Sequence, residues 1–310
     1  MGEERKRIVV VTGPTAAGKT SLAVDLALAM DGEVVNADSM QVYRGMDVGT
    51  AKPTEEEKQG VPHHLLDVVD PDQPFNAARY RELAAPAVEA IAGSGRACFV
   101  VGGTGLYIRA LLGGLFECPE ASPAVRARLS REWEEEGGES LHERLRSLDP
   151  EAAGRVHPND RVRVLRALEV IELTGRPFSA LAGGHRFQEG TFDALKICLH
   201  MSRERLYERI DARSRAMMAG GLLEETRGLI EKGYSSDLKP MQAIGYRHAS
   251  ACLEGAWSRE EAVERLQADT RRYAKRQMTW FRGEPGIHWH NPGDRDLVLQ
   301  EVALFLNRDA

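Results

Sequence analysis

The chain has 310 residues, of which 42% are apolar and 28% charged, and its formal net charge is −6, the balance of a globular protein that needs no disulfide or metal to hold its core. The longest apolar run near the start, residues 8–11, is too short for a membrane span or a secretory signal. The four cysteines form no C-x-x-C pair, so we expect reduced thiols in a cytoplasmic protein with no membrane partner.

The first third of the chain alternates between strand and helix patterns. A β-branched run at residues 8–12 ends in a glycine-rich turn and predicts a buried parallel strand, and good helix formers follow at 20–30. A second strand is expected at 33–36, a helix at 77–92 and a third strand at 98–101. This alternation predicts a parallel sheet flanked by helices.

The pattern changes at residues 119–187, where long charged helices are predicted at 124–136, 141–148 and 161–173. We expect a helical insertion domain there, with residues 1–118 and 188–310 forming the catalytic core. A fourth strand at 194–200 would return the chain to the sheet, and helices at 203–219, 222–232 and 260–281 would complete it.

A phosphate-binding loop follows the first predicted strand. The segment matches G-x-x-x-x-G-K-[ST] in full and opens a predicted helix, which is the context that this motif requires. Backbone N–H groups and the helix N-terminus hold phosphate there, while Lys19 reaches the terminal phosphate and Thr20 can ligate Mg²⁺. The predicted diphosphate-binding or nucleotide-binding residues are Gly13, Pro14, Thr15, Ala16, Ala17, Gly18, Lys19 and Thr20.

Two further polar features follow the ends of predicted strands and should lie at the same edge of the sheet. Asp38 follows the second strand, where it could bind Mg²⁺ for an ATP-using kinase, act as a general base or organise the next turn. Gly102-Gly103-Thr104-Gly105 ends the third strand, and its glycines permit a close approach of backbone to ligand. The residues alone leave these alternatives open.

Six blocks of the sequence resemble those of the tRNA dimethylallyltransferases, the IPP transferase family, in the family's order and over nearly the whole chain. The blocks are DSMQVYRGMDVGTAKP at 38–53, PHHLLD at 62–67, VGGTGLY at 101–107, HPND at 157–160, AIGYR at 243–247 and AKRQMTWFR at 274–282. The first and last are the most specific. The resemblance implies a P-loop NTPase-like parallel sheet flanked by helices, with a helical insertion that contacts tRNA.

The resemblance also implies a reaction. Dimethylallyl diphosphate would give its five-carbon group to N6 of the adenine 3′ of the anticodon, position 37, in tRNAs reading codons that start with U, and pyrophosphate would leave. Asp38 would act as general base and Thr104 would orient the reacting atoms. Lys19 and Arg213 would neutralise the leaving group, together with Mg²⁺ on Thr20. Nothing demands an oligomer, so we expect a monomer.

The second implied partner is the anticodon stem-loop of tRNA. The net charge of −6 is a weak objection, because arginines cluster locally at 161–166, 203–215 and 271–282. Without the resemblance, Arg163 and Arg166 would be a solvated helix face and His63 a turn residue. The implied tRNA-binding residues are Asp38, Ser39, Met40, Gln41, His63, Thr104, Arg126, Val162, Arg163, Val164, Leu165, Arg166, Gln242, Ala243, Ile244, Gly245, Tyr246, Arg247, Lys275 and Gln277.

Three other functions stay open as alternatives. A small-molecule kinase that binds ATP leaves the blocks at 101–107 and 274–282 unexplained, and a prenyltransferase of free AMP, ADP or ATP has less use for an arginine-bearing insertion. RNA binding alone would not require Lys19, Thr20 and Asp38 together. Two departures accompany the resemblance: Ala17 stands where the family often has Ser, and the chain ends at Ala310 without the zinc module of eukaryotic relatives, as expected of the bacterial form.

Overall fold

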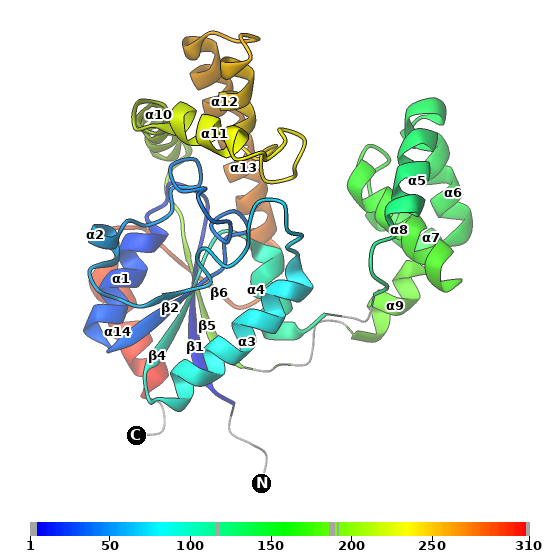
Figure 1. Cartoon of the computed structure of the whole chain (residues 1–310). Helices are drawn as coiled ribbons and strands as arrows, with labels where there is room; N and C mark the ends of the chain where they lie inside the picture. Colours follow the sequence, from blue (N-terminus) through cyan, green and yellow to red (C-terminus); the bar gives the residue numbers. More distant parts are fainter. Residues whose placement is uncertain (1–4, 116–117, 186–189, 191, 308–310) are drawn as a thin grey trace. The chain divides into compact units, whose positions relative to one another are not determined.

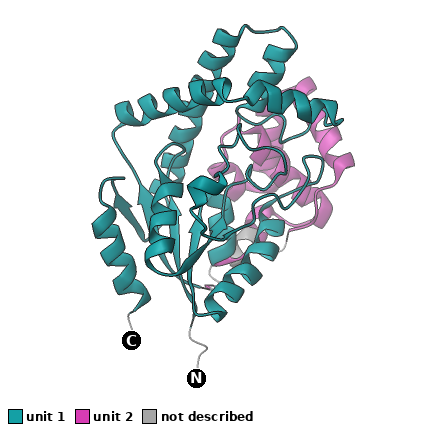
Figure 2. Cartoon of the chain, turned by 60° about the vertical axis from the view of Figure 1, so that its left-hand side comes forward, with its two compact units in different colours: residues 1–112, 191–310 teal, residues 113–190 magenta. Residues whose placement is uncertain are grey.

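The computed structural model describes residues 5–115, 118–185, 190 and 192–307. The chain forms two compact units, residues 1–112 with 191–310 and residues 113–190 (Figure 2). The insertion predicted at 119–187 falls within the second unit, and its far limit at 187/188 lies outside the described residues. None of the described helices combines the length and the apolar character that a bilayer crossing needs.

The first unit is built on a parallel sheet, in which the described strands pair in the order β3-β2-β4-β1-β5-β6 (Figure 1). Val9 of the central strand pairs with Phe99 and Thr12 pairs with Cys198, so the carboxyl ends of these strands reach one edge. The strands are β1 (Arg7–Thr12), β2 (Gly32–Asn36), β3 (His63–His64), β4 (Ala97–Val101), β5 (Asp193–Leu199) and β6 (Ile287–His290).

Helices cover both faces of this sheet (Figure 1). The described helices of the first unit are α1 (Lys19–Ala29), α2 (Glu55–Lys58), α3 (Ala77–Gly93), α4 (Gly105–Gly113), α10 (Arg203–Ala219), α11 (Leu222–Glu231), α12 (Tyr246–Leu253), α13 (Arg259–Arg282) and α14 (Arg295–Leu306), of which α10, α11 and α12 lie beyond the strand ends (Figure 1). Successive side chains of a strand point to opposite faces, and β1 is apolar at both sets of positions. Ile8 and Val10 pack with α3 and α4, whereas Val9 and Val11 pack with α1 and α14.

Helices α10–α13 and the loop that follows β2 belong to the same hydrophobic core as Ile8 and Val10. Met46 of that loop is fully buried in the same cluster as Leu222, Tyr246 and Leu266, which come from α11, α12 and α13. The segment after Asp38 is therefore held between the sheet edge and these helices, which places it where the strand ends meet.

The predicted strands and long helices are confirmed, with limits within three residues of those expected. The prediction that the chain finishes with the helix at 260–281 is wrong, because β6 pairs with β5 and α14 packs on the sheet. β6 reads Ile-His-Trp-His, with His288 and Trp289 exposed, so it lacks the apolar alternation of a half-buried strand. In α14, Val298 and Phe305 are buried, but the leucines beside them in sequence, Leu297 and Leu304, are exposed. The apolar residues therefore show no clear helical periodicity in the sequence.

The second unit is a helical bundle with its own core. Its described helices are α5 (Pro123–Glu136), α6 (Gly138–Leu148), α7 (Pro150–Arg155), α8 (Arg161–Thr174) and α9 (Phe178–His185), of which α7 and α9 were not predicted. Leu129, Leu141, Leu145 and Val164 are almost completely buried in one cluster. Asp149 begins α7 by accepting a hydrogen bond from Ala152 N at 3.0 Å, a cap that the sequence Asp-Pro-Glu permits.

We predict that Gly102→Ala destabilises the first unit by about 1–3 kcal/mol, because a Cβ at Gly102 would lie 2.2 Å from the carbonyl carbon and oxygen of Ala37, and backbone cannot move aside. Gly228→Ala in α11 is the matched control, since no atom lies within 4 Å of its added Cβ. Alanine favours the helix, so this control should be neutral or slightly stabilising. Urea unfolding measures both, and equal midpoints would contradict the prediction.

Candidate active site

The phosphate-binding loop joins β1 to α1 through backbone that only glycine adopts easily. Gly13 has φ 134°, and a Cβ there would lie 2.6 Å from Leu199 O, while Gly18 precedes α1 with φ 97°. The loop therefore wraps around the N-terminus of α1, where unpaired N–H groups favour anions. Ala17 is fully buried with α1 and the sheet, so a hydroxyl at this position would enter the core and not the pocket.

Lys19 carries the central positive charge of this loop. Its Nζ donates a hydrogen bond to Pro14 O at 2.8 Å, within the loop itself. Burial lowers the pKa of Lys19 to about 8; the nearby Asp38 carboxylate opposes this shift, and Arg213 adds to it. A side chain with this pKa is still mostly protonated at neutral pH and gains most from a bound anion.

Arg213 reaches the same loop from α10, and its Nη1 lies 3.5 Å from Thr15 Oγ1. Burial lowers the pKa of this guanidinium, while Asp38 acts in the opposite direction. Arginine stays charged over the physiological range, so two cations and one carboxylate share a poorly hydrated space. The sequence placed Arg213 here only through the family resemblance, and the structure brings it to the loop.

Asp38 is fixed in position by its neighbours in the chain. Its N–H donates to Asn36 Oδ1 at 3.1 Å, and its Oδ1 accepts from Met40 N at 2.8 Å and from Gln41 N at 3.4 Å. Asp38 thus organises the turn, as one alternative proposed, and lines the pocket as well. Its Oδ2 makes no hydrogen bond among the described residues.

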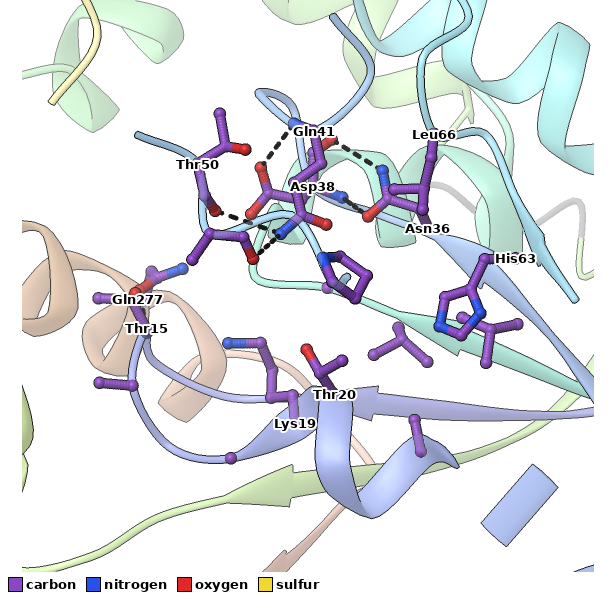
Figure 3. Close-up of a pocket in the computed structure, with 18 of the residues that line it drawn as sticks. Thr15, Lys19, Thr20, Asn36, Asp38, Gln41, Thr50, His63, Leu66 and Gln277 are labelled. Atoms are coloured by element: carbon purple, nitrogen blue, oxygen red, sulfur yellow. Dashed lines mark hydrogen bonds between the residues drawn. The ribbon is translucent and has the colours of Figure 1, made fainter. Parts of the chain in front are cut away.

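Two pockets of the first unit meet at Asp38. Figure 3 shows the first, with Lys19 and Thr20 on one side and Asp38 across from them. Residues common to both pockets are Thr15, Asp38, Thr50, Arg213 and Tyr273. The first pocket is also lined by Ala16, Gly18, Ala23, Val34, Asn36, Gln41, Ala51, Pro53, His63, Leu66, Val101, Gly102 and Gln277.

The second pocket lies between Asp38 and helices α10, α12 and α13. Most of the predicted tRNA-binding residues of the first unit line it: Ser39, Met40, Gln242, Ala243, Ile244, Tyr246 and Arg247. Gly245 starts α12 with φ 103° beside them. Gln41 and His63 belong to the first pocket, and Lys275 lines a separate pocket with Pro14 and Tyr207.

The glycines after β4 serve contacts within the protein. A Cβ at Gly103 would lie 2.2 Å from Gln277 Nε2, and a Cβ at Gly105 would lie 2.0 Å from Trp280 Nε1. Thr104 Oγ1 accepts a hydrogen bond from Ser39 N at 3.0 Å. The close approach expected of these glycines is therefore to α13 and to the loop after β2. The segment at 102–105 thus connects these two parts of the site.

Gln277 connects the phosphate-binding loop to this glycine segment. Its Oε1 accepts from Thr15 N at 2.8 Å, and its Nε2 donates to Gly103 O at 3.0 Å. Both ends of the side-chain amide are engaged inside the protein. A direct contact of this amide with tRNA would require one of these hydrogen bonds to break, so the geometry supports a role in positioning Thr15.

The predicted tRNA-binding residues of the second unit fall into two groups. Val162 and Arg163 are exposed, and Arg163 pairs with Asp160 at 3.2 Å on the surface. Val164, in contrast, is fully buried in the core of the unit, so its side chain has no surface to offer RNA. Leu165 also packs against that core, although part of its surface remains open.

Arg126 and Arg166 converge on one buried carboxylate. Arg126 Nε lies 3.0 Å from Glu169 Oε2, and Arg166 Nη1 lies 2.6 Å from the same oxygen. Burial opposes the charge of Glu169, but hydrogen bonds from Arg166 and Arg126 outweigh it and hold its pKa below the usual value. Arg166 also donates to Pro119 O at 2.8 Å, so its guanidinium stabilises the unit.

Tyr273 is a site residue that our reading of the sequence missed. It lies in α13, lines both pockets, and has its pKa raised by burial and by the charge of Asp38. Its hydroxyl therefore stays protonated and can donate a hydrogen bond. The signal was present, since Tyr273 and Gln277 are four residues apart and share one face of the helix.

Comparisons with known proteins agree with this geometry. The model of the IPP transferase family matches residues 41–284. The chain is 53% identical to the tRNA dimethylallyltransferase of Desulfosudis oleivorans, over 98% of this chain and 96% of that protein. It is 51% identical to the tRNA dimethylallyltransferase of Geobacter metallireducens, over 98% of each.

Solved structures are similar as well. The tRNA isopentenylpyrophosphate transferase of Bacillus halodurans matches with a TM-score of 0.72 and 40% identity, over 98% of each chain. A eukaryotic dimethylallyltransferase acting on tRNA matches with a TM-score of 0.78 and 28% identity, over 96% of this chain and 78% of that one. The phosphate-binding loop, the six matching blocks and these similarities all lead to one assignment: the chain belongs to the IPP transferase family.

Proposed function

We propose that the protein transfers a dimethylallyl group from dimethylallyl diphosphate to N6 of adenine 37, 3′ of the anticodon, in tRNAs that read codons starting with U. The observation that carries this proposal is the place of Asp38, at the junction of a phosphate-binding pocket and a second pocket. A donor in the first pocket and an acceptor in the second would meet at this carboxylate. The names of the similar proteins support the same reaction.

The transfer forms one bond and breaks one. The N6 nitrogen attacks C1 of the allylic group, the bond from C1 to the bridging oxygen breaks, and pyrophosphate leaves with the electron pair. Asp38 accepts the proton that N6 loses, through the carboxylate oxygen left without a hydrogen bond among the described residues. Lys19 and Arg213 stabilise the negative charge that develops on the leaving diphosphate.

The first pocket provides an apolar wall for the five-carbon group. Val34, Leu66 and Val101 line the pocket beside the phosphate-binding loop, and Val34 and Val101 belong to the rigid strands β2 and β4. Apolar carbon gains by leaving water, so the allylic tail would lie against this wall while the phosphates face Lys19 and Thr20.

The pocket also suits Mg²⁺. This ion keeps several waters and takes one or two protein oxygens together with substrate phosphates. The Thr20 hydroxyl and the Asp38 carboxylate line the same pocket, and the described residues contain no cluster of three or more acidic, histidine or cysteine ligands. Thr20 would hold the ion, which supplies charge neutralisation to the diphosphate when bound.

The acceptor adenine would enter through the second pocket. A base in an anticodon loop must unstack before an enzyme can reach its amine, and apolar and aromatic side chains hold such bases. Met40 and Met217 offer apolar surface, while Arg276 and Arg247, the latter paired with Asp269, bring guanidinium groups to the pocket. The exposed Arg163 of the second unit would contact the RNA backbone. We further propose that the enzyme is a monomer and that it acts in the cytoplasm, where tRNA is modified.

Single-turnover transfer of labelled dimethylallyl tests this proposal directly. An anticodon stem-loop, AMP and ATP are offered side by side with Mg²⁺, and the label is expected on the stem-loop alone. Label on AMP or ATP would assign the protein to the prenyltransferases of free nucleotides. Absence of transfer together with ATP hydrolysis would favour a kinase.

We predict that Asp38→Asn reduces single-turnover transfer by about 10²–10⁴-fold, because the amide cannot accept the N6 proton. Asparagine keeps a side-chain oxygen for the N–H groups of Met40 and Gln41, so the turn and the affinity for the stem-loop should persist. Filter binding and quench-flow measure the two effects. An equal loss of binding and turnover would make Asp38 a residue that only positions the turn.

We predict that the affinity for pyrophosphate falls as the pH rises past 8. Lys19 has its pKa lowered to about 8, so it is protonated below that pH and becomes neutral above it. Compared with Lys19→Arg, which stays charged, the wild-type protein should lose about ten-fold in affinity per pH unit above this value, until the pKa of the complex is reached. Calorimetry at constant Mg²⁺ measures the ratio of the two pyrophosphate affinities, wild type over Lys19→Arg. A ratio independent of pH would refute the role of Lys19.

We predict opposite outcomes for two neighbouring arginines of α8. Arg163→Ala should leave stability unchanged, weaken stem-loop binding and reduce the slope of log affinity against log salt by about one. Arg166→Ala should lower the free energy of unfolding by about 1–3 kcal/mol, because the buried Glu169 loses one of its two arginine partners. Salt titrations and urea unfolding distinguish them, and an unchanged salt slope would return Arg163 to a solvated surface.

A further inference from the structure

One carboxylate of α11 accepts four hydrogen bonds from outside its own helix. Glu225 Oε2 accepts from the backbone N–H of Asp47 at 2.9 Å and of Val48 at 2.8 Å. Its Oε1 accepts from Gly49 N at 3.1 Å and from the Tyr246 hydroxyl at 2.6 Å. Three consecutive amides and a phenol thus converge on a single side chain, and each of these bonds is to a charged acceptor, the stronger kind.

The loop lies against these helices so closely at Gly49 that no side chain would fit there. A Cβ at Gly49 would lie 2.5 Å from the Tyr246 ring and 2.9 Å from Leu222 Cδ1. Burial and the neighbouring Glu225 both raise the pKa of Tyr246, so its hydroxyl remains a donor. The backbone at 47–49 is therefore attached to α11 and α12 by direct packing and by one carboxylate.

Hydrogen bonds lead from this attachment to the turn of Asp38. Gln41 Nε2 donates to Thr50 O at 3.3 Å and to Ala51 O at 3.1 Å, immediately after the residues that Glu225 binds. The N–H of Gln41 in turn faces Asp38 Oδ1 at 3.4 Å. The side chain of Gln41 thus connects the 47–51 segment to the turn that holds the carboxylate.

We propose that Glu225 is a positioning residue that sets the acceptor side of the active site by holding the 47–51 segment, and through Gln41 the turn of Asp38, against α11 and α12. The inference rests on the proposed function, which makes Asp38 the general base and the second pocket the acceptor site. Glu225 lines neither pocket; Gly49 and Tyr246 line the second pocket, and Thr50 lines both. Its loss should act mainly on the acceptor pocket, because Glu225 binds the amides of residues 47–49 and not the phosphate-binding loop.

Glu225→Gln tests the proposal, with Glu224→Gln as the matched control. Glu224 is its exposed neighbour on the same turn of α11, and no hydrogen bond or ion pair of its side chain occurs among the described residues. Glu225→Gln should lower kcat/KM for the stem-loop by about ten-fold or more, because glutamine turns one acceptor oxygen into a donor. The affinity for pyrophosphate should stay within about two-fold, and the control should match the wild type.

Amide hydrogen exchange provides a readout that does not depend on transfer. In Glu225→Gln, Asp47, Val48 and Gly49 should exchange faster, while the amides of α1 keep wild-type protection. If the wild-type protein fails to transfer the label, the proposed function is wrong, but this exchange result still decides whether Glu225 holds the segment. Unchanged exchange at the three amides would overturn the proposal.

A double-mutant cycle that combines Glu225→Gln with Gln41→Ala tests whether the two residues act through the same segment or independently. If both residues act through the 47–51 segment, the double variant should lose much less activity than the product of the single losses. Losses that multiply would overturn the proposed path. If Glu225→Gln does not fold, Tyr246→Phe is the alternative test, because it removes one of the four hydrogen bonds to Glu225. This variant should also lower kcat/KM, by a smaller factor. An unchanged kcat/KM would count against the proposal.

Discussion

The active site depends on the close contact between the ends of β2 and β4. Thr104 N donates to Ala37 O at 3.2 Å, Ala37 N donates to Val101 O at 2.7 Å, and Gly102 has no side chain to hold the two segments apart. This contact puts Asp38 at the same edge as the phosphate-binding loop, although Asp38 and Thr20 are 18 positions apart in the chain. Parallel strands deliver their ends to one edge, and small residues there decide how closely the functional groups meet.

Once these segments meet, their charges constrain one another. Lys19 and Arg213 are two cations in a space with one opposing carboxylate, and burial lowers the pKa of both. Desolvated charges of like sign repel, so a polyanion that binds between them relieves an unfavourable state that the fold itself maintains. The structure sustains this arrangement because Gln277 accepts a hydrogen bond from Thr15 N and α10 carries Arg213 to the loop.

Arginine clusters in this chain serve two different ends, and their sequence positions do not tell them apart. Arg163 and Arg166 lie three residues apart on α8, yet one is exposed and the other is bound to the buried Glu169 and to Pro119 O. Many arginines are neutralised locally by partners a turn away or across a helix pair, so the net charge of −6 does not show which cations remain available to a polyanion. Counting basic residues therefore says less about RNA binding than knowing which of them have a buried acid to satisfy.

The sequence by itself determined the β1–loop–α1 connection, the parallel sheet and the helices of the second unit, and it predicted a phosphate site at that connection, because each follows from local periodicity or from a short motif whose physics is local. The family resemblance also implied roles for Asp38, Arg213 and several residues of the second pocket. Tertiary structure alone decided that Val164 is core, that Gln277 is engaged within the protein, and that Tyr273 and Glu225 face the site or support it. Whether a polar side chain finds its partner within the chain depends on residues far away in sequence, and so no local pattern records it.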